Sequence, residues 1–288
     1  MISAPRRNFT IPLPHGGALE LGRRCLVMGI LNVTPDSFAE RGPRLDPAAA
    51  VEAALRMEAD GADVLDVGGE STRPGAEPVG AEEELARVLP VIRALAGRVR
   101  APISVDTYKA SVARAAVDAG ASIVNDVSGL AYDPALAHAV AESGAALVLM
   151  HTRGRPQTMM AQAVYDDVVR EVAAELRSAV ASAAAAGVAV ERIVVDPGIG
   201  FAKRPAHSYG VLARLAELAA ALERPVLVGA SRKSFLRAAL DDRPAPERDW
   251  GTAAAVTAAV LGGAHIVRVH AVAEMAQVVR VAEEIRRH

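Results

Sequence analysis

Residues 122–151, SIVNDVSGLAYDPALAHAVAESGAALVLMH, contain one strand–helix–strand unit. The run Ser122 to Asn125 predicts a buried strand, Pro134 to Glu142 predicts a helix, and Ala145 to Met150 predicts a second strand. Gly144 follows the helix closely, where a left-handed capping residue is favoured. Apolar strands that are joined by a helix are typical of a parallel sheet covered by helices.

The same unit recurs along the chain, which gives eight predicted strands, each followed by a helix. The other predicted pairs are Leu26 to Leu31 with Pro47 to Ala59, Val64 to Val67 with Ala81 to Leu95, Ile103 to Val105 with Lys109 to Ala119, Ile193 to Asp196 with Tyr209 to Leu222, Val226 to Gly229 with Ser234 to Leu240, and Ile266 to Val269 with Ala273 to Arg286; Tyr165 to Ala186 follows the strand that ends at Met150. Eight such units predict an α/β fold of the TIM (β/α)8 barrel type. At 288 residues, we expect one domain over residues 1–288.

Two further elements lie outside this repeat. Phe9 to Leu13 and Ala18 to Leu21 flank a glycine turn and predict an N-terminal β-hairpin, which we expect to cap the bottom of the barrel. The weakly polar stretch Gly251 to Gly262 predicts an extra helix before the last strand.

Composition excludes several classes of protein. A formal net charge of -2 leaves no basic surface for nucleic acid, and no apolar run is long enough to cross a membrane. Cys25 is the only cysteine and stands in an apolar stretch, which is typical of a buried thiol in a reducing compartment. We therefore expect a cytoplasmic protein.

Three predicted strands end in Asp106, Asn125 and Asp196. The carboxyl ends of the strands line the active-site mouth of a barrel, so these side chains predict one site. Because buried carboxylates and amides are costly unless they are hydrogen-bonded, we expect a flat ligand that presents N–H donors, with Met150 in the pocket wall. The alternative is that Asp106 and Asp196 merely cap the turns that follow them.

A basic and polar set follows the other strands. Its members are Lys233, Arg232, Arg268 and His270 after the last two strands, Asn32 after the first, and Thr72 and Arg73 in the second loop. Guanidinium and hydroxyl donors after the last two strands of a barrel predict an anion site, most simply for phosphate. The alternative is a group of ordinary surface ion pairs.

Several other sites are disfavoured by spacing. The histidines and Cys25 show neither HExxH nor CxxC spacing, and the glycines match neither a Rossmann fingerprint nor a P-loop. His265 stands between apolar residues and is expected to be a core histidine.

Eight motifs, in order, resemble the dihydropteroate synthase family over nearly the whole chain after Leu26. They are MGILNVTPDSF (28–38), DVGGESTRPGA (66–76), SVDTYK (104–109), VNDVSGL (124–130), LMHTRGRPQTM (149–159), DPGIGF (196–201), VGASRKSF (228–235) and GAHIVRVH (263–270). The resemblance implies that the amine of p-aminobenzoate displaces diphosphate from 6-hydroxymethyl-7,8-dihydropterin diphosphate, in folate biosynthesis. It also implies that sulfonamides compete for the aminobenzoate site.

The resemblance also implies site roles. The pterin would be held by Asp106, Asn125, Met150, Asp196 and Lys233; the diphosphate and a Mg²⁺ ion would meet Asn32, Arg268 and His270; and the aminobenzoate and diphosphate side would be shaped by Phe38, Thr72, Arg73, Pro74, Phe201, Ser231 and Arg232. Among these, Asp106, Asp196, Lys233, Arg268 and His270 would be catalytic. An arylamine is already a neutral nucleophile, so no strong base is needed, and we expect a cation-like transition state stabilised by the two carboxylates.

The chain departs from the family pattern in three places. Residues 39–41 read Ala-Glu-Arg in the first loop, Ala202 replaces the usual glycine of Gly-Phe-Gly-Lys, and Ala271 replaces the usual aspartate after His270. Alanine is unfavourable at position 202 if that residue needs a positive φ. These departures leave open a paralogue that binds pterin without catalysis. A second alternative is a methyltetrahydrofolate:corrinoid methyltransferase of the same superfamily, which has no use for the STRPG and SRKS stretches. Family members suggest a homodimer, with Gly251 to Gly262 as an interface candidate.

Overall fold

The parallel sheet closes on itself. In this computed structural model, which describes residues 6–34, 46–72 and 75–288, eight strands pair in the order β8-β7-β6-β5-β4-β3-β10-β9. Their bounds are β3 Leu26–Asn32, β4 Val64–Gly68, β5 Ile103–Asp106, β6 Ile123–Asp126, β7 Ala146–Met150, β8 Ile193–Asp196, β9 Leu227–Val228 and β10 Ile266–Val269. Val195 of β8 forms a parallel bridge with Val226, just before β9. That bridge joins the two edges, and the predicted (β/α)8 barrel is confirmed.

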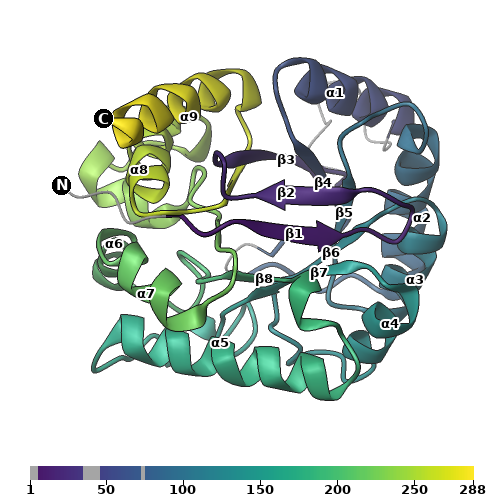
Figure 1. The fold of residues 1–288 in the computed structure, drawn as a ribbon, viewed down its shortest axis with the longest axis horizontal. Coiled ribbons are helices and arrows are strands. Elements are labelled where there is room, and N and C mark those ends of the chain that lie inside the picture. The colour runs from purple at the N-terminus through teal and green to yellow at the C-terminus, as the bar shows by residue number, and fades with distance from the viewer. Residues whose placement is uncertain (1–5, 35–45, 73–74) are drawn as a thin grey trace.

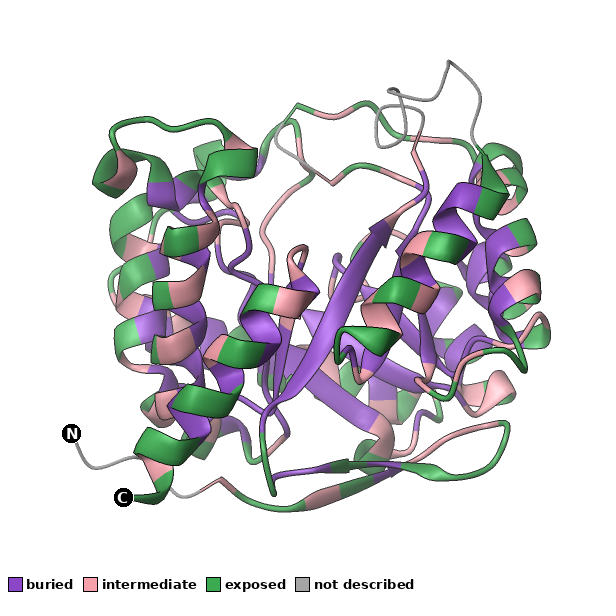
Figure 2. Ribbon diagram, turned by 90° about the horizontal axis from the view of Figure 1, so that it is seen from above, coloured by how far each residue is buried: buried purple, intermediate pink, exposed green. Residues whose placement is uncertain are grey.

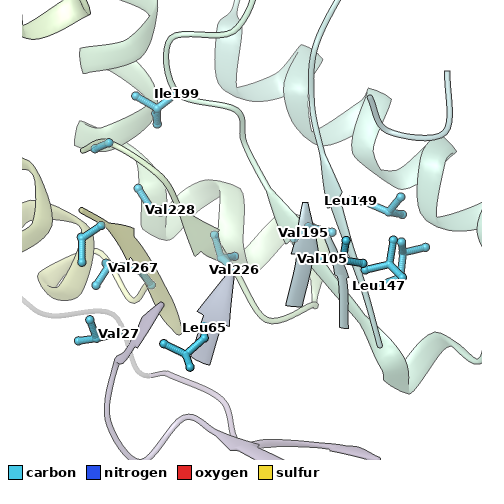
Figure 3. Close-up of a cluster of buried hydrophobic side chains, with 14 of the residues drawn as sticks. Val27, Leu65, Val105, Leu147, Leu149, Val195, Ile199, Val226, Val228 and Val267 are labelled. Carbon is cyan, nitrogen blue, oxygen red and sulfur yellow. The ribbon is translucent and has the colours of Figure 1, made fainter. Parts of the chain in front are cut away.

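Helices surround the barrel in Figure 1. They are α1 Pro47–Ala59, α2 Ala81–Leu95, α3 Ala110–Asp118, α4 Leu136–Ser143, α5 Val168–Ala185, α6 Pro205–Ala213, α7 Leu215–Leu222, α8 Asp249–Leu261 and α9 Val272–Arg287. Each strand sends alternate side chains outward, and these pack against the buried faces of the helices. Figure 3 shows part of this layer, with Leu65, Val105, Leu147 and Val195 from neighbouring strands.

The hairpin closes one end of the barrel. β1 (Phe9–Pro12) pairs antiparallel with β2 (Ala18–Leu21). The pair lies across the end of the barrel that is opposite to the carboxyl ends of its strands (Figure 2). Ile11 and Leu21 point inward and are almost fully buried against barrel residues such as Val148 and Val194. The hairpin therefore seals the apolar barrel interior from water at the bottom, as predicted.

Two predicted helices differ from the structure. The span Tyr209 to Leu222 is two helices, α6 and α7, because Arg214 between them leaves helical geometry with φ -112 and ψ 26. α6 begins earlier than predicted, at Pro205, whose fixed φ favours the first helical position. Ser234–Leu240 is a 3₁₀ helix. Among the described residues, no helix combines the length and apolar character that crossing a membrane requires.

Candidate active site

Strand register brings the predicted polar residues to one level of the barrel mouth. Asn32 pairs with Gly68, Gly68 with Asp106, and Asp106 with Asn125, across four neighbouring strands. Met150 pairs with Asp196 on the next two strands. Because parallel strands share a direction, their carboxyl ends meet at one rim, and the predicted acidic set is brought together there.

Arg268 of β10 joins this acidic set. Its Nε donates to Oδ2 of Asp66 at 2.6 Å, and its Nη2 donates to Oδ2 of Asp106 at 2.7 Å. Nδ2 of Asn125 donates to the same Asp66 oxygen at 3.1 Å. Burial raises the pKa of the Asp106 carboxyl, and the Arg268 guanidinium opposes that effect.

This pairing differs from the sequence-based expectation. Arg268 was expected on a separate basic side with the diphosphate, whereas two of its nitrogens neutralise buried carboxylates. Asp66 is fully buried, and it was not among the site residues expected from the sequence. The acidic side and Arg268 therefore form one ionic cluster. The third guanidinium nitrogen of Arg268, Nη1, makes no hydrogen bond within the described residues.

Asp196 and Lys233 form the opposite wall. Oδ1 of Asp196 accepts from the backbone N–H of Gly198 at 2.7 Å, so the turn-capping alternative is correct for this residue as well. Nζ of Lys233 donates to the carbonyl oxygen of Ile199 at 2.6 Å. Burial lowers the pKa of Lys233 to about 8, and the charge of Asp196 works against that shift. Met150 is buried below them.

The remaining basic residues divide into two groups. Oγ of Ser231 lies 2.9 Å from Nδ1 of His270, so these two residues meet at the mouth. The guanidinium of Arg232 instead donates twice to the Asp249 carboxylate, at 2.7 Å each, at the start of α8. For Arg232 the ion-pair alternative is therefore correct in this structure.

Phe201 and Thr72 line one cavity of about 40 Å³. Glu70, Tyr108 and Tyr132 also line it, and none of the three was expected from the sequence. The hydroxyl of Tyr108 donates to the carboxylate of Glu70 at 2.9 Å, and this hydrogen bond joins two of the cavity's lining residues. The predicted site residues Phe38, Arg73 and Pro74 lie outside the described residues.

Asn32 has a position that suits a hard cation. Its Oδ1 and the Asp106 Oδ2 flank Gly68, where an added Cβ would lie 3.9 Å and 3.7 Å from them. Mg²⁺ is commonly held by one or two protein oxygens, with waters and substrate phosphates completing its shell. Within residues 6–34, 46–72 and 75–288, no group of three or more His, Cys, Asp or Glu side chains is arranged for a metal. Asn32 and Asp106 thus offer two oxygens for such an ion, and the rest of its shell would have to come from a ligand and water.

Comparisons with known proteins agree with this geometry. The family model described as "Pterin binding enzyme" matches residues 28–270. Dihydropteroate synthase of Synechocystis sp. is 46% identical over 280 residues, which cover 97% of this chain and 96% of that protein. The Escherichia coli dihydropteroate synthase is 47% identical over 257 residues, 89% of this chain and 90% of that protein.

Solved structures agree as well. The Yersinia pestis dihydropteroate synthase with a sulfonamide drug complex has a TM-score of 0.91 and 41% identity, over 97% of this chain and 100% of that chain. The Xanthomonas albilineans dihydropteroate synthase with 4-aminobenzoic acid has a TM-score of 0.88 and 42% identity, over 98% of each chain.

Proposed function

The chain belongs to the pterin-binding enzyme family as a dihydropteroate synthase, a transferase of folate biosynthesis, and we propose the following roles for its barrel mouth. The amine of p-aminobenzoate displaces diphosphate from 6-hydroxymethyl-7,8-dihydropterin diphosphate. One bond forms, between the arylamine nitrogen and the pterin methylene, and the bond from that methylene to the diphosphate oxygen breaks. The nitrogen then loses a proton.

The pterin binds between the two walls of the mouth. Asp106, Asn125 and Asp196 accept from the N–H groups of its ring edge, while Lys233 donates and Met150 packs below. The observation that carries this role is the convergence of two buried carboxylates, each with a pKa raised by burial, at the ends of β5 and β8. The N–H groups of the pterin would supply the hydrogen bonds that the ionised carboxylates of Asp106 and Asp196 need when they are buried.

The diphosphate leaves on the side of Arg268 and His270. Nη1 of Arg268 and the His270 imidazole stabilise the charge that develops on the leaving oxygens. Asn32 would hold a Mg²⁺ ion on this side, and the ion would supply further charge neutralisation for the diphosphate. The negative charge of Asp106 and Asp196 stabilises positive charge on the pterin methylene, which gives a cation-like transition state. A negligible kinetic isotope effect at that methylene would count against it.

The aminobenzoate lies against Phe201 and Thr72. The sequence resemblance assigns Ser231 and Arg232 to the same side, although the guanidinium of Arg232 is paired with Asp249. We assign the same side to Phe38, Arg73 and Pro74, on the sequence resemblance alone. The solved relatives that hold 4-aminobenzoic acid and a sulfonamide drug complex support aminobenzoate binding and sulfonamide competition here. An arylamine needs no strong base, so a nucleophilic His or Cys is not required.

Turnover with both substrates and Mg²⁺ tests the function. We expect diphosphate release that depends on p-aminobenzoate. Pterin binding without such release would favour the non-catalytic paralogue instead, and methyl transfer to a corrinoid would favour the methyltransferase.

We further propose that the protein is a cytoplasmic homodimer of single-domain chains, with α8 at the interface. Gly251 is partly exposed, and Ala254 and Ala258 are exposed. These small positions on one helix suit close helix packing. Sedimentation of the purified chain at micromolar concentration tests the dimer, and an Ala258→Arg variant should dissociate it.

A further inference from the structure

The loop that follows β8 is fixed by backbone hydrogen bonds at several points. The N–H of Phe201 donates to the carbonyl oxygen of Gly198 at 3.0 Å. The carbonyl oxygen of Phe201 accepts from Nζ of Lys203 at 3.2 Å, and the carbonyl oxygen of Ala202 accepts from the Tyr165 hydroxyl at 3.0 Å. The side chains of Lys203, the next residue of the loop, and of Tyr165, outside the loop, therefore hold the peptide units on either side of Ala202.

Lys203 is the unusual member of this loop, because its long cationic side chain is buried, at 2% exposure. Its Nζ lies 2.8 Å from Nδ1 of His151, and Nε2 of His151 lies 3.0 Å from Oε2 of Glu175. Burial lowers the pKa of Lys203 to about 7. In its charged form Nζ only donates, so Nδ1 of His151 accepts and Nε2 carries the proton that it donates to Glu175. The residues form a chain from the half-exposed Glu175 to the loop.

The backbone that this chain of contacts holds is strained. Ala202 has φ 46 and is fully buried, and non-glycine residues adopt such positive φ values at an energetic cost. A conformation of this kind persists only where the surrounding structure determines it from several sides. The two carbonyl contacts made by Lys203 and Tyr165 flank the strained residue directly.

The loop after β8 positions the aromatic ring of Phe201. Nζ of Lys233 lies 4.5 Å from the centroid of this ring, and the ring lines the cavity that Thr72 also lines. The ring thus stands between the residue assigned to pterin and the space assigned to aminobenzoate. A shift of the Phe201 peptide would move the wall of the arylamine site and leave Asp106 and Asn125 where they are.

We propose that Lys203, held by His151, is a positioning residue for the arylamine substrate: its contact with the Phe201 carbonyl fixes the Phe201 ring and thereby the affinity for p-aminobenzoate. The inference rests on the proposed function and deepens it. The two lysines thereby have different roles: Lys203 acts on the arylamine substrate through Phe201, whereas Lys233 is assigned to the pterin. A purely structural role makes a different prediction, because removing one partner of a buried polar pair lowers folding stability without acting on one of the two substrates selectively.

A matched pair of variants tests the proposal. Lys203→Met removes the charge and the donor, whereas Lys203→Gln removes the charge and keeps an N–H donor on a side chain that is one bond shorter. We expect Lys203→Met to raise the KM for p-aminobenzoate by about tenfold, the order for one lost charge-assisted hydrogen bond. The KM for the pterin diphosphate should change by less than about twofold on the same scale. Lys203→Gln should restore part of the loss.

A second pair covers the case in which Lys203→Met fails to fold. Tyr165→Phe removes the hydroxyl that bonds the Ala202 carbonyl, and it should raise the same KM by a smaller factor. Tyr209→Phe is its control, because the Tyr209 ring packs on Phe235 and its hydroxyl makes no hydrogen bond within the described residues. We expect both KM values of Tyr209→Phe to equal those of the wild type.

The outcomes separate the inference from the proposed function. Wild-type protein without aminobenzoate-dependent diphosphate release overturns the function. Wild-type turnover with variants whose two KM values rise together, or do not change, overturns the inference alone. A selective rise in the aminobenzoate KM that Lys203→Gln partly reverses supports it.

Discussion

Gly198→Ala is the substitution whose cost the structure defines most sharply. Gly198 has φ 65, and a Cβ built on it would lie 1.9 Å from the carbonyl oxygen of His151, well inside the 3.0 Å limit of real Cβ contacts. That oxygen belongs to a backbone that is itself fixed, because the His151 N–H donates to the Asp196 carbonyl at 2.8 Å. The turn that holds Asp196 must therefore move.

The magnitude has two parts. A non-glycine residue at positive φ costs about 1–2 kcal/mol, and overpacking against a fixed neighbour costs about 1–3 kcal/mol more. Gly17→Ala isolates the first part, because Gly17 has φ 75 in the hairpin turn and its added Cβ would meet nothing within 4 Å. We expect Gly17→Ala to lose about 1–2 kcal/mol of unfolding free energy and Gly198→Ala about 2–5 kcal/mol.

Urea unfolding of the two variants and the wild type measures these losses. Turnover is measured on the same samples at a temperature where all three are folded. Gly17→Ala should keep normal turnover, since the hairpin lies at the far end of the barrel, whereas Gly198→Ala should lose it with the displaced Asp196. Equal stability losses in the two variants, or normal turnover in Gly198→Ala, would refute the reasoning.

Three further predictions concern separate residues. Lys233→Ala should cripple turnover and leave the circular dichroism spectrum unchanged, and near-normal kinetics would contradict its assignment to pterin. Burial lowers the pKa of His265 from 6.5 to about 4. Between these values His265 binds a proton in the unfolded chain but not in the folded one, so the free energy of unfolding falls as the pH drops from 6.5 to 4. His265→Asn should flatten that slope by up to about 1.4 kcal/mol per pH unit, as urea unfolding across this range measures; an unchanged slope contradicts the argument. Burial raises the pKa of the Cys25 thiol to about 12, so iodoacetamide should label it only in urea, and rapid labelling of the native protein would contradict its burial.

Much of the fold could be predicted because local patterns report it. The ranges predicted for α1 and α2 agree with the structure, since Pro47 starts the first helix and apolar periodicity marks both. The break at Arg214 could not be predicted in this way. Arg214 donates to Asp167, the N-cap residue of α5, as well as to Glu217 nearby. The contact with Asp167 depends on how helices distant in the sequence pack together.

The positions of the candidate site residues on the rim could be predicted in the same way, whereas their pairing could not. Asp106, Asn125 and Asp196 could be identified at strand ends, because a parallel barrel places every strand end on one rim. The pairing of Arg268 with Asp66 joins residues 202 positions apart. No local pattern reports such a contact.

The sequence by itself determined the barrel, the rim and the residue types on it, because strand periodicity and glycine caps act over short distances. Only the tertiary structure decided how those residues pair. Register and barrel closure placed Arg268 among carboxylates, turned Arg232 towards Asp249, and buried Lys203 against His151. Burial then changed the chemistry of these groups, since desolvation and the nearest opposite charge set the pKa of a side chain, and both depend on three-dimensional neighbours.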